Sequence, residues 1–220
     1  MTNKHLLNTE TKREMTYHEW LDIWLEVYNL PLYAHSTYLS RMYSTRTLKA
    51  NIEDKNLSMY SNIELQMLIN KLFDKGYSKA TLIKMNTIIK RSFMQAKKDK
   101  FIEELIGQDI IIPTNAPIKK VEALTRSEQK QVEKAAINCA GGDVIIFLLY
   151  SGLRRSELIN LPWTDYDANT GHLKIRKSKT EAGVRVILLP LKAREVINKR
   201  SRCSKWIFTS QANKQLNYTS

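Results

Sequence analysis

The sequence predicts a mainly helical protein with one small β-hairpin, an α+β fold. Glycine and proline are scarce, at 7 and 5 of 220 residues, and apolar residues recur at helical spacing through the first half. Residues 171–190 alternate instead between apolar and polar side chains around a polar tip at 180–183, which indicates a hairpin. A chain of this length suits one large or two small domains.

The first half is expected to form an all-helical domain. Its first helix, 16–28, would place Trp20, Ile23, Trp24 and Val27 on one buried face. The other helices of this half are expected at 36–52, 62–76 and 79–100. Three helix starts along the chain have the capping-box spacing, a hydroxyl residue followed three positions later by glutamate: Thr16 and Glu19, Ser61 and Glu64, Thr125 and Glu128.

A segment without helical period separates the two halves and contains Pro113 and Pro117, so we expect a linker there. Beyond it, helices are expected near 126–139, 143–150 and 191–200, the last after the hairpin. The expected organisation is a flexible N-terminus at 1–15, a helical domain at 16–109, the linker at 110–122 and a second domain at 123–220.

The chain is strongly basic. Lys and Arg number 35 against 22 Asp and Glu, a formal net charge of +13. Residues 1–115 hold 16 basic and 13 acidic side chains, and residues 116–220 hold the other 19 and 9, so the excess lies mostly in the second half. Such a balance favours an anionic partner, and nucleic acid is the commonest. The alternative is a solvated basic surface without a partner.

Several classes of protein do not fit the composition. The two cysteines, Cys139 and Cys203, have no metal-ligand spacing, so neither a metal site nor a disulfide framework is expected. The longest apolar run, 144–150, is too short to span a membrane, and residues 1–15 lack the apolar stretch of a signal peptide. We expect a cytoplasmic protein without membrane contact.

Basic residues on two expected helices are candidates for phosphate contacts. Lys84, Arg91 and Lys98 recur every seven residues on the polar face of the fourth helix, and Arg41 lies among small hydroxyl residues on the second. The alternative is an ordinary solvated helix face. A denser group lies on the hairpin, where an edge protected by lysine is the alternative reading: Lys174, Arg176, Lys177, Lys179 and Arg185.

The stretch 150-YSGLRRSELINLPW-163 places two arginines between apolar segments. Gly152 can end the preceding helix in a left-handed conformation, and Glu157 would lie in the first turn of the next helix. A fixed guanidinium at such a junction matches a phosphate, with Glu157 orienting it. The alternative is a structural Arg–Glu pair that joins two helices.

These motifs carry a family resemblance. Residues 151–167, SGLRRSELINLPWTDYD, closely resemble the first catalytic-arginine box of the tyrosine recombinases, the phage integrase family. Residues 177–191 are similar to that family's hairpin with the catalytic lysine, and 123–136 to the first helix of its catalytic domain. The first half resembles its all-helical, SAM-like core-binding domain, so the resemblance implies that domain followed by part of a catalytic domain.

The resemblance also implies roles for single residues. Arg154 would bind the scissile phosphate, Glu157 would orient Arg154, and Lys179 would protonate the leaving 5′ hydroxyl, with Lys177 as the neighbouring candidate. Arg155 falls at a variable position of the box and is expected to contact DNA or solvent. In the family a tyrosine attacks the DNA and forms a 3′-phosphotyrosyl link, without metal or other cofactor.

One departure from the family concerns its His-x-x-Arg box and nucleophilic tyrosine, which follow the hairpin. None of the histidines here, His5, His18, His35 and His172, precedes an arginine by three residues, and we do not nominate Tyr218 as nucleophile. We therefore expect a C-terminally truncated integrase of a mobile element that binds duplex DNA but does not cleave it alone. The full-length form would self-associate on DNA. The alternative is a non-catalytic DNA-binding remnant or regulator.

Overall fold

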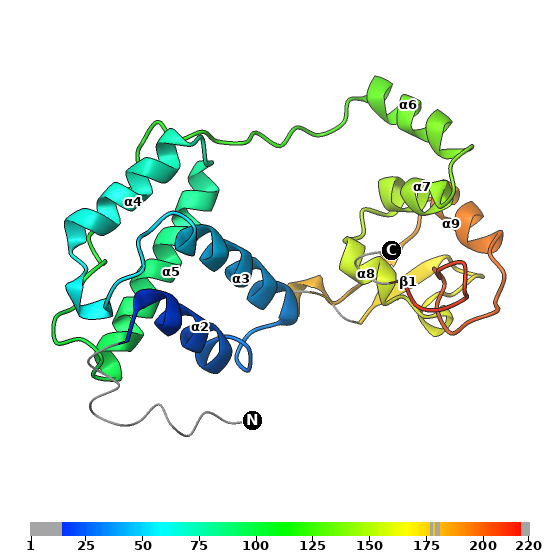
Figure 1. Ribbon diagram of the computed structural model, residues 1–220. Helices are drawn as coiled ribbons and strands as arrows, with labels where there is room; N and C mark the ends of the chain where they lie inside the picture. Colours follow the sequence, from blue (N-terminus) through cyan, green and yellow to red (C-terminus); the bar gives the residue numbers. More distant parts are fainter. Residues whose placement is uncertain (1–14, 177, 179–180, 217–220) are drawn as a thin grey trace. The chain divides into compact units, whose positions relative to one another are not determined.

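The computed structural model describes residues 15–176, 178 and 181–216. The chain divides into two compact units, Met1–Val121 and Glu122–Ser220 (Figure 1). Helices are the main secondary structure of both units, and the strands of the described residues form one two-stranded antiparallel sheet. The predicted fold class, mainly helical with a small hairpin, is therefore confirmed.

The first unit is built from helices alone. The caps of α2 and α4 are the predicted ones: the Thr16 and Ser61 hydroxyls each accept from the backbone N–H of a glutamate three residues on, whose carboxylate accepts from the cap residue's N–H. The helices are α2 (Tyr17–Tyr28), α3 (His35–Lys49), α4 (Asn62–Asp74) and α5 (Lys79–Lys98), with a 3-10 turn at Leu57–Met59.

Helix α5 anchors the core of this unit. The Tyr17 ring stacks on Phe93 at a centroid distance of 4.8 Å, and the Trp20 indole N–H donates to the Ser92 carbonyl at 2.9 Å. The expected buried face of α2 is partly wrong, because Val27 is 52% exposed. Leu21 and Leu25 are buried beside the two tryptophans instead, which rotates the apolar face away from Val27.

Part of the expected linker belongs to the first unit. Ile110 and Ala116 are buried in its core, and the Lys79 N–H donates to the Pro117 carbonyl at 2.8 Å. Ile118 and Val121 are 71% and 92% exposed. The prolines therefore interrupt helix formation without detaching residues 110–117 from the helices that precede them.

The second unit surrounds one β-hairpin with short helices. Strand β1 (His172–Ile175) pairs with β2 (Arg185–Leu188), with His172 opposite Leu188 and Ile175 opposite Arg185. Phe147, Leu173, Ile197 and Phe208 are among its fully buried core residues. The helices are α6 (Arg126–Ala136), α7 (Gly142–Ser151), α8 (Arg155–Ile159) and α9 (Leu191–Asn198), with 3-10 turns at Trp163–Asp165 and Glu181–Gly183.

Helix α6 is attached mainly through polar contacts, since Ala136 is its one buried residue. Glu133 accepts hydrogen bonds from the Tyr150 hydroxyl of α7 at 2.6 Å and from the Lys192 ammonium of α9 at 3.1 Å. Lys192 also donates to the Tyr150 oxygen at 2.6 Å. The hydrogen bond from Tyr150, followed by those from Gln129 and Lys192, lowers the pKa of Glu133 to about 2. We call Glu133, Tyr150 and Lys192 the α6 triad.

Among the described residues, no helix combines the length and the hydropathy that crossing a membrane requires.

Candidate functional site

The junction between α7 and α8 places one arginine outside a helix and one carboxylate inside it. Gly152 ends α7 in the predicted left-handed conformation, with φ 63°, and its N–H donates to the Leu148 carbonyl at 3.1 Å. Arg154 is extended, with φ −71° and ψ 148°, and precedes the first residue of α8. Glu157 lies in the first turn, where the helix dipole favours an acidic side chain.

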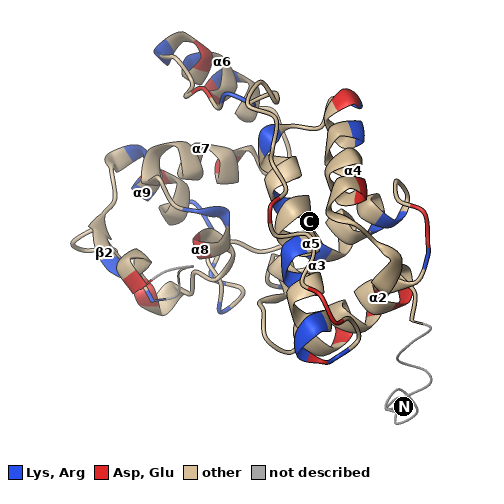
Figure 2. Ribbon diagram, turned by 90° about the vertical axis from the view of Figure 1, so that its left-hand side faces the viewer, with Lys and Arg blue, Asp and Glu red and all other residues tan. Residues whose placement is uncertain are grey.

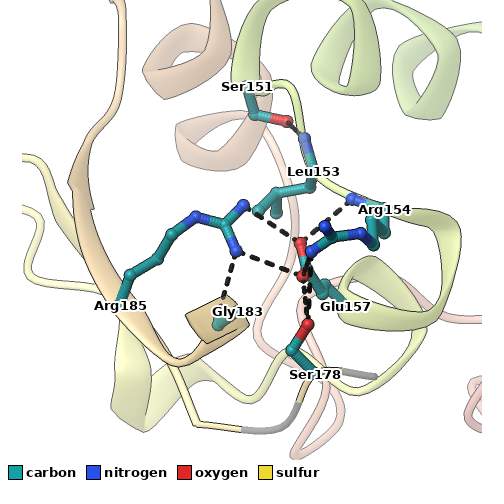
Figure 3. Close-up of polar contacts among 7 residues, drawn as sticks. All are labelled: Ser151, Leu153, Arg154, Glu157, Ser178, Gly183 and Arg185. Atoms are coloured by element: carbon teal, nitrogen blue, oxygen red, sulfur yellow. Dashed lines mark hydrogen bonds and ion pairs between the residues drawn. The ribbon is translucent and has the colours of Figure 1, made fainter. Parts of the chain in front are cut away.

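Glu157 is the centre of the site, and its side chain is fully buried. The carboxylate accepts from the Arg154 backbone N–H at 3.0 Å and from the Arg154 Nη1 at 2.9 Å. The Ser178 hydroxyl, from the hairpin, donates to it at 2.8 Å (Figure 3). Residues far apart in the sequence therefore converge on one buried acid.

Arg185 completes this group from strand β2. Its Nη1 and Nη2 donate to the two carboxylate oxygens of Glu157 at 3.1 and 3.2 Å, and Nη1 also donates to the Gly183 carbonyl at 2.8 Å (Figure 3). Such a bidentate contact fixes the orientation of the Arg185 guanidinium and also pairs the two charges. The sequence suggested Arg185 as a DNA contact, whereas the structure shows a guanidinium engaged with Glu157.

Glu157 is ionised at neutral pH in this setting. Burial raises the pKa of the carboxyl group, but the hydrogen bonds from Arg185, the Arg154 backbone and Ser178 outweigh burial and hold the pKa at about 2. One carboxylate thus faces two guanidinium groups. The three charges sum to +1, so the cluster remains attractive to an anion.

Arg154 is the member of the cluster that faces solvent, with 55% of its side chain exposed. Its Nη1 is held by Glu157 and lies 3.3 Å from the Ser178 hydroxyl oxygen. A guanidinium has five N–H donors, so donors remain for an external acceptor. A structural Arg154–Glu157 pair and a Glu157 that orients Arg154 towards a phosphate were alternative interpretations of the sequence, and the contacts observed are those that either one requires.

The other hairpin candidates lie in different environments. Arg176 donates from Nε to the buried Asp165 carboxylate at 2.6 Å, so one edge of its guanidinium is engaged. Lys174 is exposed on the outer face of β1, opposite Val186. Lys177 and Lys179 lie outside the described residues.

In the first unit the candidates lie on α3 and α5. Lys84, Arg91 and Lys98 are all exposed, as their spacing predicts, and Figure 2 shows Lys and Arg recurring along α5. Arg41 is half-buried and contacts Asn29 and Tyr33. In the second unit, Arg155 is exposed in the first turn of α8.

Three residues of these sites were missed from the sequence: Ser178, Asn29 and Tyr33. Their partners at these sites lie 8 or more positions away, and no periodicity or motif of the residues themselves marks such contacts. Among the described residues, no three His, Cys, Asp or Glu side chains are grouped so that they could hold a metal ion.

Part of the chain is similar in sequence to known proteins. Residues 118–220 match the model of the phage integrase family. A tyrosine recombinase XerC-like protein of Caldanaerobacter subterraneus subsp. tengcongensis is 26% identical over 126 residues, which are 55% of this chain and 32% of that protein. Residues 118–220 are therefore similar in sequence to the phage integrase family, and the XerC-like relative is a tyrosine recombinase.

Solved structures share the fold at low sequence identity. A lambda integrase dimer bound to a COC′ core site superposes with a TM-score of 0.76 at 20% identity, over 94% of this chain and 61% of that one. The Tn1549 transposon integrase in complex with transposon right end DNA gives a TM-score of 0.75 at 18% identity, over 93% and 74%. A lambda integrase tetramer bound to a Holliday junction gives 0.74 at 19%, over 99% and 66%.

Proposed function

We propose that this chain binds duplex DNA and represents the DNA-holding part of a site-specific recombinase that cuts and rejoins DNA. Its first unit would be the core-binding domain, and its second unit would supply the first part of the catalytic domain. The match of residues 118–220 to the phage integrase family, the net charge of +13 and similar structures described as bound to DNA support this proposal. Relatives described as a dimer and a tetramer on DNA support self-association of the full-length form.

The observation that carries the proposal is the exposed Arg154 held by a buried Glu157. A guanidinium fixed before the ligand arrives needs no reorganisation to bind a phosphate oxygen, and it stabilises negative charge that develops there during phosphoryl transfer. Glu157 fixes the direction of Arg154. Arg185 offsets the charge of Glu157, so that the carboxylate does not cancel the attraction.

The chemistry of strand cleavage in the full-length form would follow the family. Lys179, or Lys177 beside it, would protonate the leaving 5′ hydroxyl while a tyrosine forms the 3′-phosphotyrosyl link. The printed sequence contains no His-x-x-Arg motif. We therefore propose that this 220-residue chain holds DNA without cutting it, which is also what a non-catalytic DNA-binding remnant would do.

A duplex nicked near the cleavage position tests the catalytic part of the proposal, because loss of the short fragment traps any covalent adduct. We expect the 220-residue chain to retain the duplex in a gel shift and to give no adduct in a denaturing gel. An adduct formed by this chain would refute the non-cleaving proposal.

Substitution of the two adjacent arginines tests the phosphate contact. Arg154→Ala is expected to weaken duplex binding by about tenfold, since a charge-assisted contact is lost, with little change in thermal unfolding. Arg155→Ala, which removes the same charge next to it, serves as the matched control and should have a smaller effect. If Arg154→Ala instead unfolds the second unit and Arg155→Ala does not, Arg154 has a structural role only.

A further inference from the structure

Two arginines from different helices meet on one tyrosine in the first unit. Tyr33 lies in the connection between α2 and α3. The guanidinium carbon of Arg41, from α3, lies 3.8 Å from the centre of the Tyr33 ring. Arg91, from α5, donates from Nη1 to the Tyr33 hydroxyl at 3.1 Å. The tyrosine therefore joins two cationic groups that are 50 positions apart in the sequence.

Asn29 fixes the direction of Arg41. This asparagine is fully buried, and its side-chain N–H donates to the Trp24 carbonyl at 2.7 Å. Its side-chain oxygen accepts a hydrogen bond from the Arg41 Nη1, and its backbone carbonyl accepts from the Tyr33 N–H at 3.1 Å. One edge and one face of the Arg41 guanidinium are thus held before any ligand binds, which lowers the entropy cost of binding.

The charge of this cluster is uncompensated. Among the described residues neither Arg41 nor Arg91 forms an ion pair with a carboxylate, and the partners that hold them are an amide and a phenol. The pKa of the Tyr33 phenol is lowered, chiefly by its hydrogen bond with Arg41 and further by the charges of Arg41 and Arg91. Two like charges brought to one residue repel each other, and an anion placed against both relieves that repulsion.

We propose that Arg41, Arg91 and Tyr33 form a preorganised site for one phosphate of duplex DNA, in which Asn29 acts as the positioning residue for Arg41. The inference rests on the proposed DNA binding and deepens it, because Arg41 and Arg91, which the sequence gives as separate candidate phosphate contacts, would bind the same phosphate. The remaining guanidinium N–H groups of Arg41 and Arg91 donate to the phosphate oxygens.

The test measures binding of a short labelled duplex to the full chain by fluorescence anisotropy at several salt concentrations. Arg41→Lys keeps the charge but loses the planar fork and the stacking, so affinity should fall by about tenfold with an unchanged salt slope. Arg46→Lys is the matched control, since Arg46 is exposed on the same helix and is not stacked closely on a ring. Its guanidinium carbon lies 5.9 Å from the centre of the Tyr43 ring, against 3.8 Å between Arg41 and Tyr33. It should change affinity by less than about twofold.

A double-mutant cycle tests the site by a second route. Arg91→Gln should reduce the salt slope by about one, because one phosphate contact is lost. Tyr33→Phe removes the hydroxyl that holds Arg91, so Arg91→Gln should cost less affinity in that background than in the wild-type chain. The proposed site would be refuted if the effects of Tyr33→Phe and Arg91→Gln on the binding free energy were strictly additive. Equal losses of affinity in Arg41→Lys and Arg46→Lys would also refute it. If Arg41→Lys fails to fold, the cycle decides alone.

The outcomes separate this inference from the proposed function. Suppose that the wild-type chain binds the duplex with a steep salt dependence, that Arg41→Lys binds as tightly as the wild type, and that the cycle gives no coupling energy. Only the Arg41 site is then refuted. A wild-type chain that does not bind the duplex refutes the proposed function and the DNA assignment together. Thermal stabilisation by inorganic phosphate in that case, lost in Arg41→Lys, would identify a site for a small anion instead.

Discussion

Glu157 is a buried acid whose two oxygens together receive hydrogen bonds from three residues. Removing a buried charge that is paired costs more than the pair itself contributes, because the partners are left without an acceptor. Arg185, which is 32% exposed, would lose its bidentate partner, and Arg154 would lose the group that directs it. The energetic role of this cluster and its proposed binding role therefore depend on the same side chain.

We predict that Glu157→Gln destabilises the second unit by about 3 kcal/mol at neutral pH. The folded pKa of about 2 lies below the ordinary 4.5, so the ionised acid stabilises the fold above pH 4.5, and this contribution is lost as the pH falls towards 2. Wild-type stability should decline across that window, whereas the variant should decline less. Native-state hydrogen exchange of the α8 and β2 amides measures both effects.

The control for this prediction is Glu195→Gln, which removes an exposed carboxylate from α9. It should change stability by less than about 0.5 kcal/mol and leave the pH profile unchanged. If the two variants have the same pH profile, the low pKa does not contribute to stability.

At the residue scale, sequence reasoning found Arg154 and its near partner Glu157 but missed the partners that lie farther along the chain. Arg154 and Glu157 are three residues apart, so their contact follows from helix geometry at the start of α8. The second partner, Arg185, is 28 positions from Glu157, and its fork depends on how the hairpin packs beside α8. Asn29 and Tyr33 were missed because a buried amide and an exposed tyrosine carry no periodic signal.

At the scale of elements, α6 depends on side-chain hydrogen bonds more than on apolar burial. Its contact with α7 and α9 runs through the α6 triad, in which Tyr150 supplies the shortest bond to Glu133. A helix with one buried residue has little hydrophobic stabilisation of its own, so its attachment should respond to the loss of a single hydroxyl.

We predict that Tyr150→Phe speeds hydrogen exchange of the α6 amides by about tenfold, since one hydrogen bond to a charged group is lost. Tyr166→Phe is the matched control, because its hydroxyl lies 3.5 Å from Asn198 and makes no contact with the triad. Unchanged exchange in α6, or an equal effect of the control, would show that apolar contacts hold the helix.

Local rules predicted the elements well where the determining contacts are local. The Thr16, Ser61 and Thr125 caps involve residues three apart, and all three are formed as predicted. The hairpin follows from alternation along its own strands. The expected linker is different, because the burial of Ile110 and Ala116 depends on the surface that α4 and α5 offer, which no local pattern records.

At the scale of the whole molecule, the basic excess predicts a strong electrolyte effect on DNA binding. If about five side chains each reach one phosphate, the plot of log affinity against log salt should have a slope of about −4 to −5. The candidates in the described residues include Arg41, Lys84, Arg91, Lys98 and Lys174. Anisotropy measurements across a range of salt concentrations give this slope, and a flat response would contradict the DNA interface.

A combined variant locates the interface. Replacing Lys84, Arg91 and Lys98 by glutamine should reduce the slope by about three if the α5 stripe follows the backbone. The same loss of charge at Lys130, Lys134 and Lys199, all exposed in the second unit, should change it by less than about one. Equal slopes for the two variants would indicate diffuse attraction without a defined track.

The shared carboxylate also constrains how this sequence can drift. A substitution of Glu157 alone removes the carboxylate that accepts both hydrogen bonds from the partly exposed Arg185 guanidinium. A substitution of Arg185 alone removes one of the two guanidinium groups that balance the buried charge of Glu157. Descendant sequences should therefore alter positions 157 and 185 together or not at all, although 28 positions separate them.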